Sequence, residues 1–449
     1  MGGTQYSRAP AGRRFKPYPE YKDSGVEWLG KIPAHWGVQR AKALEKNAAY
    51  LVQTGPFGVQ LHASDYLGHG DAGVPLILIK HVNDLAIVHE DLPQISEDTA
   101  GRLSEYRVKA GDIVFSRVGS VGRIGLVTEQ ESGWLISGQM LRLRFLNTSL
   151  LSSYALYAIS SDSVLAYFDL MSVGTTRDSI NTTILREMPL PLPSVHEQRA
   201  IADFLDRETA KIDALIAKKE RLIELLQEKR TALITQAVTK GLYPNAPMKD
   251  SGIEWLGKIP AHWEVKKLFW LTDCLDGRRI PLNAEERGRM QGEFPYWGAN
   301  SIVDHVDRWL FDEELVLLGE DGAPFFDRLK PVAFRVSGKI WVNNHAHMLR
   351  PTRRIDGSFL AFALNCVDYT LFIEGTTRDK LTQGNMMSIP IQCPQIPEQR
   401  VISAFLDHET AKIDSLVIKI REAIDRLKEY RTALISAAVT GKIDVRDLG

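Results

Sequence analysis

One segment of about 43 residues occurs twice in this chain and constrains its fold more than any other feature. The copies run from Glu197 to Thr239 and from Glu398 to Thr440, align without a gap at an offset of 201 residues, and contain neither Pro nor Gly. Both are rich in Ala, Leu, Glu, Lys and Arg, which are strong helix formers. The repeat therefore predicts two long helices, each spanning roughly 64 Å at ~1.5 Å per residue.

Apolar residues in both copies recur at steps of three and four, or of seven where a step is skipped, as in the a/d seam of a coiled coil. The predicted seam is Ile201, Leu205, Ile212, Leu215, Leu222, Leu226 and Leu233 in the first copy, with Glu208, Lys219 and Lys229 at the skipped steps. In the second copy it is Ile402, Leu406, Ile413, Leu416, Ile420, Ala423, Leu427, Tyr430 and Leu434, with Glu409 polar. Such a helix needs a partner stripe in water, so we expect antiparallel pairing of the copies around a pseudo-twofold axis. The alternative is a hairpin of core helices without further purpose.

The size and composition of the chain indicate several globular domains. Its 449 residues are 44% hydrophobic, enough for two to four domains with real cores. The cysteines are odd in number and show no CxxC spacing, so we expect reduced thiols in a cytoplasmic protein. No apolar run approaches the ~20 residues of a membrane span, and no signal peptide is evident. The net charge of -1 argues neither for nor against a nucleic-acid partner.

A second repeat precedes each region between the helices. The sequence KDSGVEWLGKIPAHW at residues 22–36 returns at residues 249–263 with fourteen of fifteen positions identical, at an offset of 227. It has the first seven positions of a phosphate-binding loop, but Ile32 stands where Ser or Thr is required. We expect instead an aromatic-anchored turn in which Trp28 and Trp36 pack against the domain.

The remaining sequence predicts two α+β domains. Strand-like runs such as VPLILIK and MLRLRFL in the first half, and ELVLLGEDG and KIWVNNHAHML in the second, are followed by helical patches. Ser194 is a candidate N-cap for the first long helix. The predicted segments are a flexible basic tail at 1–21, a first domain at 22–196, a central helix at 197–241, a second domain at 242–397, a C-terminal helix at 398–442 and a tail at 443–449.

The two domains share their flanks but not their interiors. GTTRD at residues 174–178 recurs at residues 375–379, while the sequences between the shared flanks show little identity. Two different domains mounted on near-identical helices would hold two recognition surfaces at a set distance. Readers on one face of B-DNA sit ~34 Å apart or at a multiple of that distance, which helices of this length can span. A DNA-touching role for the basic N-terminal segment is a further possibility.

The doubled motifs resemble the DNA-specificity subunit of type I restriction–modification systems. The sequence W-L-G-K-I-P-x-H-W, a variable domain, G-T-T-R, E-Q-R-x-I-x-x-F-L-D and a long helix ending in R-T-A-L-I occur twice between Lys22 and Lys442. The resemblance implies two globular target-recognition domains separated by antiparallel coiled-coil helices, each domain reading one half of a bipartite double-stranded DNA target. It implies that the helices act as a ruler and dock two adenine-N6 methyltransferase subunits. Restriction subunits would join them, with S-adenosylmethionine, ATP and Mg on these partners and no cofactor in this chain.

No motif predicts catalysis by the chain itself. The S-adenosylmethionine loop, the N/D-P-P-Y/F tetrapeptide, a complete Walker motif and helicase boxes are all absent from the sequence. His345 and His347 alternate along a predicted strand without a carboxylate or Cys at ligand spacing, so we expect core or turn histidines and no metal site. Cys366 has no identifiable base. A protein-only coiled-coil adaptor and an enzyme with an unrecognised site are the two alternatives.

The charge of the domains gives little guide to DNA contacts. Residues 37–196 contain 13 Lys and Arg against 16 Asp and Glu, and residues 264–397 contain 16 against 18, giving -3 and -2. Because DNA affinity depends largely on phosphate neutralisation, we expect charge sorted to one face and phosphate contacts from the methyltransferase partners. Polar and Gly-rich loops supply the candidate DNA-binding residues, for each of which a solvated surface position is the alternative: Gln60, His62, Lys80, Arg117, Ser120, Arg123, Thr176, Arg177, Arg278, Arg279, Asn300, Arg328, Thr377, Arg378 and Lys380.

Residues shared by both domains are poor candidates for choosing bases. Arg177 and Arg378 stand in the repeated GTTRD motif, so we expect phosphate or scaffold contacts from them. The helices carry a separate expectation. Four extra residues near Lys229 would lengthen one helix by ~6 Å, close to two base-pair steps, and should widen the gap between unchanged half-sites.

Overall fold

The chain forms two compact units, each containing one globular domain and a stretch of both long helices. The computed structural model describes residues 15–45, 51–56, 58, 60–67, 72–117, 123–145, 149–172, 180–374 and 379–448. The first unit comprises Met1–Ala217 with Ala423–Gly449, and the second comprises Lys218–Glu422. The units divide inside the helices because each helix packs its two halves against different hydrophobic cores. Among the described residues, no helix combines the length and apolarity needed to cross a membrane.

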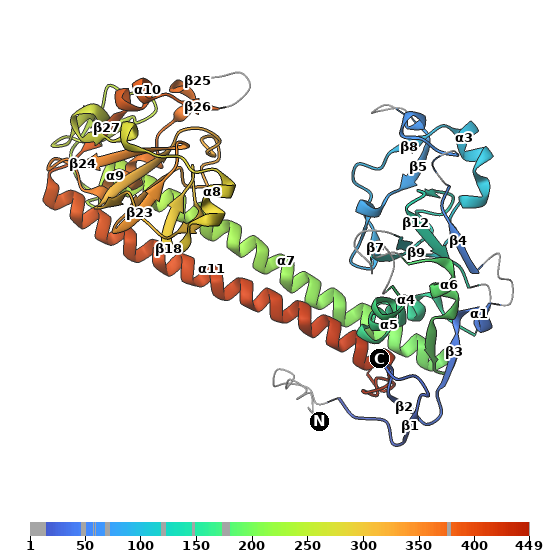
Figure 1. Cartoon of the computed structure of the whole chain (residues 1–449). Coiled ribbons are helices and arrows are strands. Elements are labelled where there is room, and N and C mark those ends of the chain that lie inside the picture. The colour runs from blue at the N-terminus through green and yellow to red at the C-terminus, as the bar shows by residue number, and fades with distance from the viewer. Residues whose placement is uncertain are drawn as a thin grey trace. The chain divides into compact units, whose positions relative to one another are not determined.

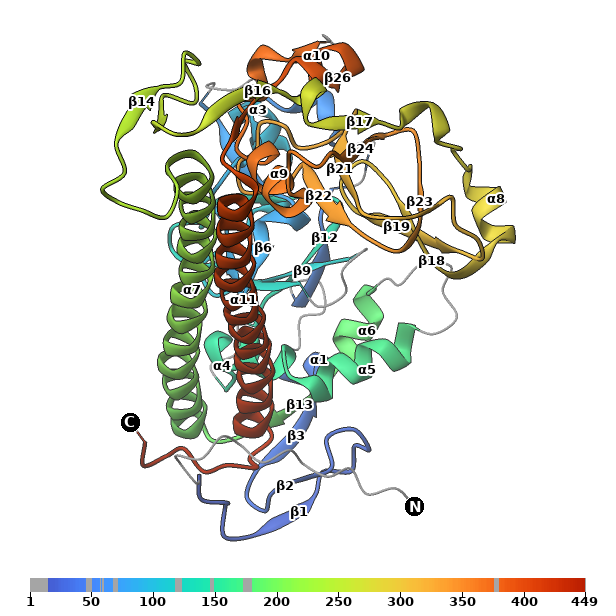
Figure 2. The same cartoon turned by 90° about the vertical axis from the view of Figure 1, so that its left-hand side faces the viewer.

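The long helices are α7 (Val195–Lys240) and α11 (Ile396–Val439). Figures 1 and 2 show them side by side and running in opposite directions, as the repeat predicted. In the first unit, Arg431 Nε lies 3.0 Å from Asp213 Oδ1, and in the second, Arg230 Nε lies 3.5 Å from Asp414 Oδ1. The two ion pairs are related by the 201-residue offset, so the same antiparallel register holds in both units.

The predicted seam was correct at Leu205, Ile212, Leu226, Leu233 and their counterparts in α11, and wrong by one residue at the alternate positions between them. Leu215, Leu222 and Leu416 are 43%, 45% and 47% exposed, whereas Ile216 packs against the first core and Val417 is buried. The less exposed positions form a regular heptad that repeats at the 201-residue offset: Leu205, Thr209, Ile212, Ile216, Lys219, Ile223, Leu226, Arg230, Leu233 and Ala237 in α7, and Leu406, Thr410, Ile413, Val417, Ile420, Ile424, Leu427, Arg431, Leu434 and Ala438 in α11. At Leu215, Leu222 and Leu416 the error arose because the next residue is also apolar, and either residue can continue the pattern.

Each globular domain is built on a four-stranded antiparallel sheet of the same topology. In the first unit the order is β10-β9-β12-β4, and in the second it is β22-β21-β24-β17. The strands are β4 (Val52–Thr54), β9 (Ile113–Ser116), β10 (Ile124–Leu126) and β12 (Met140–Leu143), matched by β17 (Thr272–Cys274), β21 (Leu315–Gly319), β22 (Ala333–Val336) and β24 (Ala346–Pro351). Chain order along the sheet is therefore identical although the sequences have little in common.

A second sheet in each domain contains one parallel strand pair but differs in size. The first unit has the order β11-β5-β8, and the second has β19-β18-β23-β20. These strands are β5 (Val74–Ile77), β8 (Gln94–Ile95) and β11 (Leu135–Ile136), and β18 (Gln291–Trp297), β19 (Ile302–Val306), β20 (Phe311–Asp312) and β23 (Lys339–Val342). The first unit also has a small hairpin of β6 (Val82–Asn83) and β7 (Ala86–Ile87).

Short helices complete both domains and confirm the α+β class. In the first unit they are α1 (Ala41–Leu44), α3 (Glu97–Arg102), α4 (Ser152–Ile159), α5 (Asp162–Ser172) and α6 (Thr182–Glu187). In the second they are α8 (Ala284–Arg289), α9 (Gly357–Leu364) and α10 (Gln383–Ser388). α4 and α9 are buried against the cores that include the long helices. All three cysteines, Cys274, Cys366 and Cys393, are free.

The repeated 15-residue segment forms the predicted aromatic-anchored turn in both units. It folds as the hairpin β1 (Tyr21–Asp23)–β2 (Lys31–Pro33) in the first unit and β14 (Met248–Asp250)–β15 (Lys258–Pro260) in the second. Trp36 and Trp263 at its end are fully buried, and the Trp28 ring lies 5.3 Å from that of Tyr167. A second strand pair follows each turn: β3 (Gly37–Arg40) with β13 (Pro189–Leu192), and β16 (Glu264–Lys267) with β27 (Pro390–Cys393).

A carboxylate joins this turn to the start of each long helix. The indole Nε1 of Trp36 donates to Glu197 Oε1 at 3.3 Å, and His35 Nε2 lies 2.7 Å from the same oxygen. The predicted cap is confirmed, because Ser194 Oγ accepts from the Glu197 backbone N–H at 3.3 Å and donates to its side chain at 2.9 Å. Trp263 and His262 repeat the arrangement at Glu398, with distances of 3.1 and 2.8 Å.

The glutamine after each carboxylate binds the domain backbone. Gln198 Oε1 accepts from Leu151 N at 2.8 Å, and Gln399 Oε1 accepts from Asp356 N at 2.7 Å, so both fix the segment entering α4 or α9. The repeated E-Q-R motif therefore carries two separate attachments between helix and domain.

Both terminal segments are packed where the structure describes them, which corrects the expectation of flexibility in residues 1–21 for the described part, residues 15–21. Tyr18 and Val445 are 2% and 1% exposed, and Lys16 pairs with Asp444 in a β-bridge. The Asp444 N–H donates to the Lys16 carbonyl at 2.7 Å, and the Tyr21 hydroxyl donates to the carbonyl of Gly441 at 2.9 Å. Backbone pairing between distant segments cannot be recognised from either segment alone, so composition suggested a tail.

The revised seam predicts opposite outcomes for two adjacent residues. Replacing Ile216 by Ala should lower the free energy of unfolding by about 1–2 kcal/mol, because its side chain packs against the first core. Replacing exposed Leu215 by Ala should change it by less than about 0.5 kcal/mol. Urea denaturation of both variants measures this, and a larger loss for Leu215→Ala would restore the original seam.

The carboxylate joint predicts a pH-dependent stability. Burial alone would raise the pKa of Glu197, but hydrogen bonds from His35, Ser194 and Trp36 outweigh burial and lower it below its usual value of 4.5. The contribution of Glu197 to the free energy of unfolding should therefore be fully present above about pH 4.5. It should be lost as the pH falls through the lowered pKa of the folded state. Glu197→Ala should cost about 1–3 kcal/mol near pH 7 by leaving buried donors unpaired, and less in acid.

Glu398→Ala is the matched variant for this measurement. Its side chain is 19% exposed against 6% for Glu197, and no Ser caps the second helix, so we expect a smaller loss. Chemical denaturation from pH 3 to pH 7, followed by circular dichroism, gives the comparison. A Glu197→Ala effect that grew as the pH fell would contradict the linkage.

Candidate nucleic-acid interface

The predicted DNA contacts of the first unit fall into two separate groups. Gln60 and His62 are exposed beside the 3-10 turn η1 (Ala63–Asp65). The Tyr106 hydroxyl donates to Gln60 Oε1 at 3.1 Å, and the His62 backbone donates to Asp65 Oδ2 at 2.7 Å. Both residues therefore belong to the lobe built on the three-stranded sheet, whose core includes Leu61 and Tyr106.

The other group lies around β9 and β10. Lys80 is exposed in the 3-10 turn η2 (Ile79–His81), and Arg123 Nη1 donates to the carbonyl of Ile79 at 3.5 Å, so the structure brings Lys80 and Arg123 together. Arg117 is half-buried directly after β9. Ser120 lies between Arg117 and Arg123 and outside the described residues. The same holds for Thr176, Arg177, Thr377 and Arg378 of the GTTRD motifs, whose roles stay predictions.

Two of the candidates in the second unit, Arg279 and Lys380, converge on Glu320. Arg279 Nη1 donates to Glu320 Oε2 at 2.6 Å, and Lys380 Nζ lies 3.3 Å from Glu320 Oε1. Lys380 opens the short strand β26 (Lys380–Leu381), which pairs with β25 (Ile373–Glu374). Arg278 is exposed, with its guanidinium carbon 5.2 Å from the centre of the Phe311 ring. The structure therefore gathers Arg279 and Lys380 at Glu320, while Arg278 lies beside Phe311 and Asn300 lies in the exposed turn between β18 and β19.

Arg279 is largely buried and forms its bonds inside the protein. Its side chain is 13% exposed, and Nη1 also donates to the carbonyl of Ala346 at 2.7 Å. A second contact reaches Asp276 Oδ2, 3.6 Å from Nη2. These bonds make Arg279 a poor candidate for direct base contact and a good candidate for supporting its neighbours.

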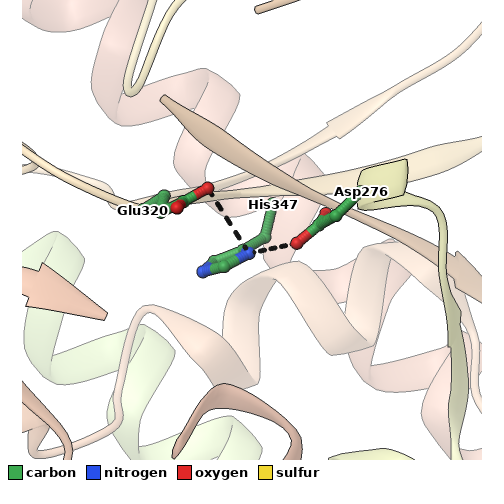
Figure 3. Close-up of side chains that lie close together, drawn as sticks. All are labelled: Asp276, Glu320 and His347. Carbon is green, nitrogen blue, oxygen red and sulfur yellow. Dashed lines mark hydrogen bonds and ion pairs between the residues drawn. The ribbon is translucent and has the colours of Figure 1, made fainter. Parts of the chain in front are cut away.

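Asp276, Arg279, Glu320 and His347 form what we term the charge cluster. Figure 3 shows the His347 ring between the Asp276 and Glu320 carboxylates. His347 Nδ1 lies 2.6 Å from Asp276 Oδ2 and 3.9 Å from Glu320 Oε2, and Nε2 lies 2.8 Å from the carbonyl of Leu381. The His347 side chain is 1% exposed. His347 is thus a core histidine, as predicted, although with two carboxylates that the local sequence did not reveal.

The electrostatics of the charge cluster favour the ionised form of Asp276. Burial by itself would raise the pKa of Asp276, but hydrogen bonds from His347 and the Met348 backbone, together with the charges of His347 and Arg279, lower it below its usual range. Burial raises the pKa of the neighbouring Cys274 to about 11, so that thiol is neutral. The acidic and basic side chains of the charge cluster lie inside the protein and neutralise one another.

Within the described part of the chain, one His/Asp/Glu group has ligand-type atoms close enough for a metal, namely Asp276, Glu320 and His347, all within 4.8 Å. The cationic position beside these carboxylates is filled by Arg279, which bonds both of them. An ion would have to displace that guanidinium and break the bond between Asp276 and His347. The donor set therefore fits an internal salt-bridge network better than a metal site.

Arg328 lies in a different place, at a cavity of about 450 Å³ beside α7. Cationic and aromatic side chains line it, among them Arg230, Lys330, Arg335, Trp297, Phe334 and Phe362. Three of these cations are already paired: Arg230 with Asp414, Lys330 with Asp327 at 3.1 Å and Arg335 with Glu314 at 2.8 Å. Arg328 thus offers an exposed charge at the rim, separate from the group at Glu320.

The described residues offer little to a nucleophilic mechanism. Burial raises the pKa of Cys366 to about 11, a shift only partly offset by the nearby Thr235 hydroxyl, so the thiol is protonated. The sequence missed Asp276 and Glu320 because they lie 71 and 27 positions before His347. It also missed the role of Glu197 and Glu398, although their exact repetition alongside two His-Trp pairs was a usable signal.

Two relatives that match this chain over most of its length are specificity subunits. The chain is 25% identical over 437 residues to the MjaX specificity subunit assigned to a type I restriction enzyme of Methanocaldococcus jannaschii, covering 93% of this chain and 96% of the relative. It is 22% identical over 463 residues to the MjaIX specificity subunit of the same organism, covering 97% and 99%.

A solved structure from work on complex assembly and conformational transition of the type I R-M system shares the fold. It has a TM-score of 0.65 at 15% identity and covers 91% of this chain and 98% of that chain. The family described as the type I restriction modification DNA specificity domain matches residues 68–225 and 260–426, which together make up more than half of the sequence. The chain therefore belongs to the family of non-catalytic DNA specificity subunits of type I restriction–modification systems.

Proposed function

We propose that each unit reads one half of a bipartite double-stranded DNA target. The observation that carries the proposal is the duplicated frame with unlike contents. Both domains use the same four-stranded sheet order and the same Trp–Glu joint, yet they differ in their second sheets and in the charges placed on them. Two domains with the same scaffold and different surfaces are suited to reading two different short DNA sequences.

The helices α7 and α11 set the gap between the half-sites in this proposal. They have 46 and 44 residues, so each spans about 66–69 Å at ~1.5 Å per residue. Matching ion pairs, Arg431–Asp213 and Arg230–Asp414, support one fixed register along the seam. A coiled coil of this kind resists changes in length, which is the property required of a ruler.

The partners follow from the family. Two adenine-N6 methyltransferase subunits dock on the helices, and restriction subunits complete an ATP-dependent nuclease. S-adenosylmethionine, ATP and Mg bind to those subunits. Exposed apolar side chains on the helices away from the seam, including Leu222, Leu225 and Ile418, support a protein partner there.

The proposed DNA contacts are those that the structure leaves accessible. Lys80 and Arg123 lie close together in the first unit, and in the second unit Lys380 is held at Glu320 while Arg278 is exposed beside Phe311. Gln60, His62, Asn300 and Arg328 are exposed but isolated from these residues. Since domain charges are slightly negative overall, the methyltransferase subunits supply further phosphate contacts in this proposal.

Methylation mapping of the host chromosome tests the function directly. With the gene intact, we expect a two-part adenine-methylated motif with a fixed unspecified gap, and we expect it to vanish when the gene is deleted. Deletion of the methyltransferase gene should remove the same motif and serves as the control. If neither deletion changes any such motif, the protein-only adaptor gains support, and a pull-down for a methyltransferase decides the matter.

Insertions into the helices test the ruler. Four residues added after Lys229 should widen the gap while both half-sites stay the same, because one helix grows by ~6 Å. Seven residues added to both helices, after Arg221 and after Glu422, keep the heptad and serve as the matched variant. That variant should widen the gap by about three base pairs, since ~10.5 Å is added at ~3.4 Å per base pair. An unchanged gap in a folded variant would show that the helices are not the ruler.

A further inference from the structure

The charge cluster of the second unit holds the strand that carries Lys380. The Leu381 N–H donates to the carbonyl of Glu320 at 2.8 Å, and His347 Nε2 lies 2.8 Å from the Leu381 carbonyl. Lys380 pairs with Asp321 in an antiparallel bridge, and its ammonium lies 3.3 Å from Glu320 Oε1. Leu381 is fully buried whereas the Lys380 side chain is 52% exposed. The strand is therefore anchored from inside while its lysine faces solvent.

Both ring nitrogens of His347 face hydrogen-bond acceptors. The partner of Nδ1 is the Asp276 carboxylate, whose other oxygen accepts from the Met348 N–H at 2.8 Å. The partner of Nε2 is a backbone carbonyl, which has no proton to give. A neutral imidazole carries only one N–H. Its unprotonated nitrogen would then face either the Asp276 carboxylate or the Leu381 carbonyl, with no proton between the two acceptors. With Asp276 ionised, both contacts are satisfied when both ring nitrogens carry protons.

The charged groups around His347 are compatible with an imidazolium. Asp276 and Glu320 are acidic, Arg279 and Lys380 are basic, and Cys274 is a neutral thiol beside Asp276. Arg279 bonds both carboxylates without touching either ring nitrogen, so His347 and Arg279 share the negative charge between them. The Asp276 carboxylate is the closest counter-charge, at 2.6 Å from Nδ1.

Among the described residues, the first unit has no matching group of His, Asp and Glu side chains. His347 lies on β24, whose counterpart in the sheet order of the first unit is β12 (Met140–Leu143). The sequence of β12, MLRL, contains no histidine and no carboxylate. The charge cluster therefore belongs to the part of the second unit that differs between the domains.

We propose that His347, protonated on both nitrogens, is a positioning residue that holds Lys380 for contact with the DNA backbone of the half-site read by the second unit. The proposal rests on the proposed function. It assigns the ammonium of Lys380 to a phosphate and the charge cluster to keeping β26 in place behind it. His347 itself touches no DNA.

Binding by the complex with its methyltransferase subunits tests the link between the two residues. On a duplex carrying both half-sites, His347→Gln and Lys380→Gln should each weaken binding by about three- to tenfold and lower the salt slope by about one. The double variant should bind no more weakly than Lys380→Gln, because His347 acts through Lys380. On a duplex that ends before the second half-site, all variants should match the parent protein.

Additive losses in the double variant, or equal losses on the shortened duplex, would overturn the proposal. His305→Gln is the matched control, because His305 is exposed on β19 of the same unit and should leave binding unchanged. If His347→Gln fails to fold, Lys380→Gln remains informative on its own. Unchanged binding by that variant on the full duplex would also overturn the proposal.

The protonation state is measured separately and without DNA. Nitrogen-15 NMR of the full chain at pH 7 should show protons on both ring nitrogens of His347, and a neutral tautomer would refute the mechanism. This measurement distinguishes a failure of the proposed function from a failure of the role proposed for His347. A complex that binds no DNA, with His347 doubly protonated, would count against the proposed function, whereas a neutral His347 in a DNA-binding complex would count against this inference alone.

Discussion

A buried carboxylate at the start of each long helix is the contact on which the frame depends. Glu197 and Glu398 lie where the helix dipole favours negative charge, and each accepts from a fully buried Trp indole. The same indoles pack against the end of the opposite helix, because a Cβ on Gly241 would lie 3.3 Å from the Trp263 ring and one on Gly441 would lie 3.3 Å from that of Trp36. One tryptophan thus connects a turn, a helix start and a helix end.

The frame was predictable because its contacts recur as exact repeats. The helices, their antiparallel pairing, the aromatic turn and the Ser194 cap follow from residues that sit close together in sequence. The seam failed at Leu215 and Leu222 because each has an apolar neighbour on its C-terminal side, and helical periodicity cannot choose between adjacent residues. The polar members of the heptad, Thr209 and Arg230, resolve the choice only once their partners are known.

The recognition surface was far less predictable. Its candidates were chosen as polar residues in loops. In the fold, the Lys380 side chain is about half exposed to solvent, whereas Arg279 forms an ion pair with Glu320 inside the protein. Which cation is displayed depends on carboxylates brought in from distant strands. Composition cannot supply that information, and the small negative charge of both domains conceals it further. Only the repeated motifs pointed reliably to structure, and they pointed to scaffold rather than to readout.

Tyr243 has two counterparts in the first unit. Lys16 precedes it by the offset of the turn repeat and Asp444 follows it by the offset of the helix repeat, and these two residues are bridged to each other. In the second unit, one continuous segment around Tyr243 connects a long helix to a 15-residue turn. In the first unit, a backbone hydrogen bond joins the two corresponding segments. The hydrogen bond between Asp444 and Lys16 in the first unit therefore links the end of a long helix to the segment before a 15-residue turn, a link that is covalent in the second unit.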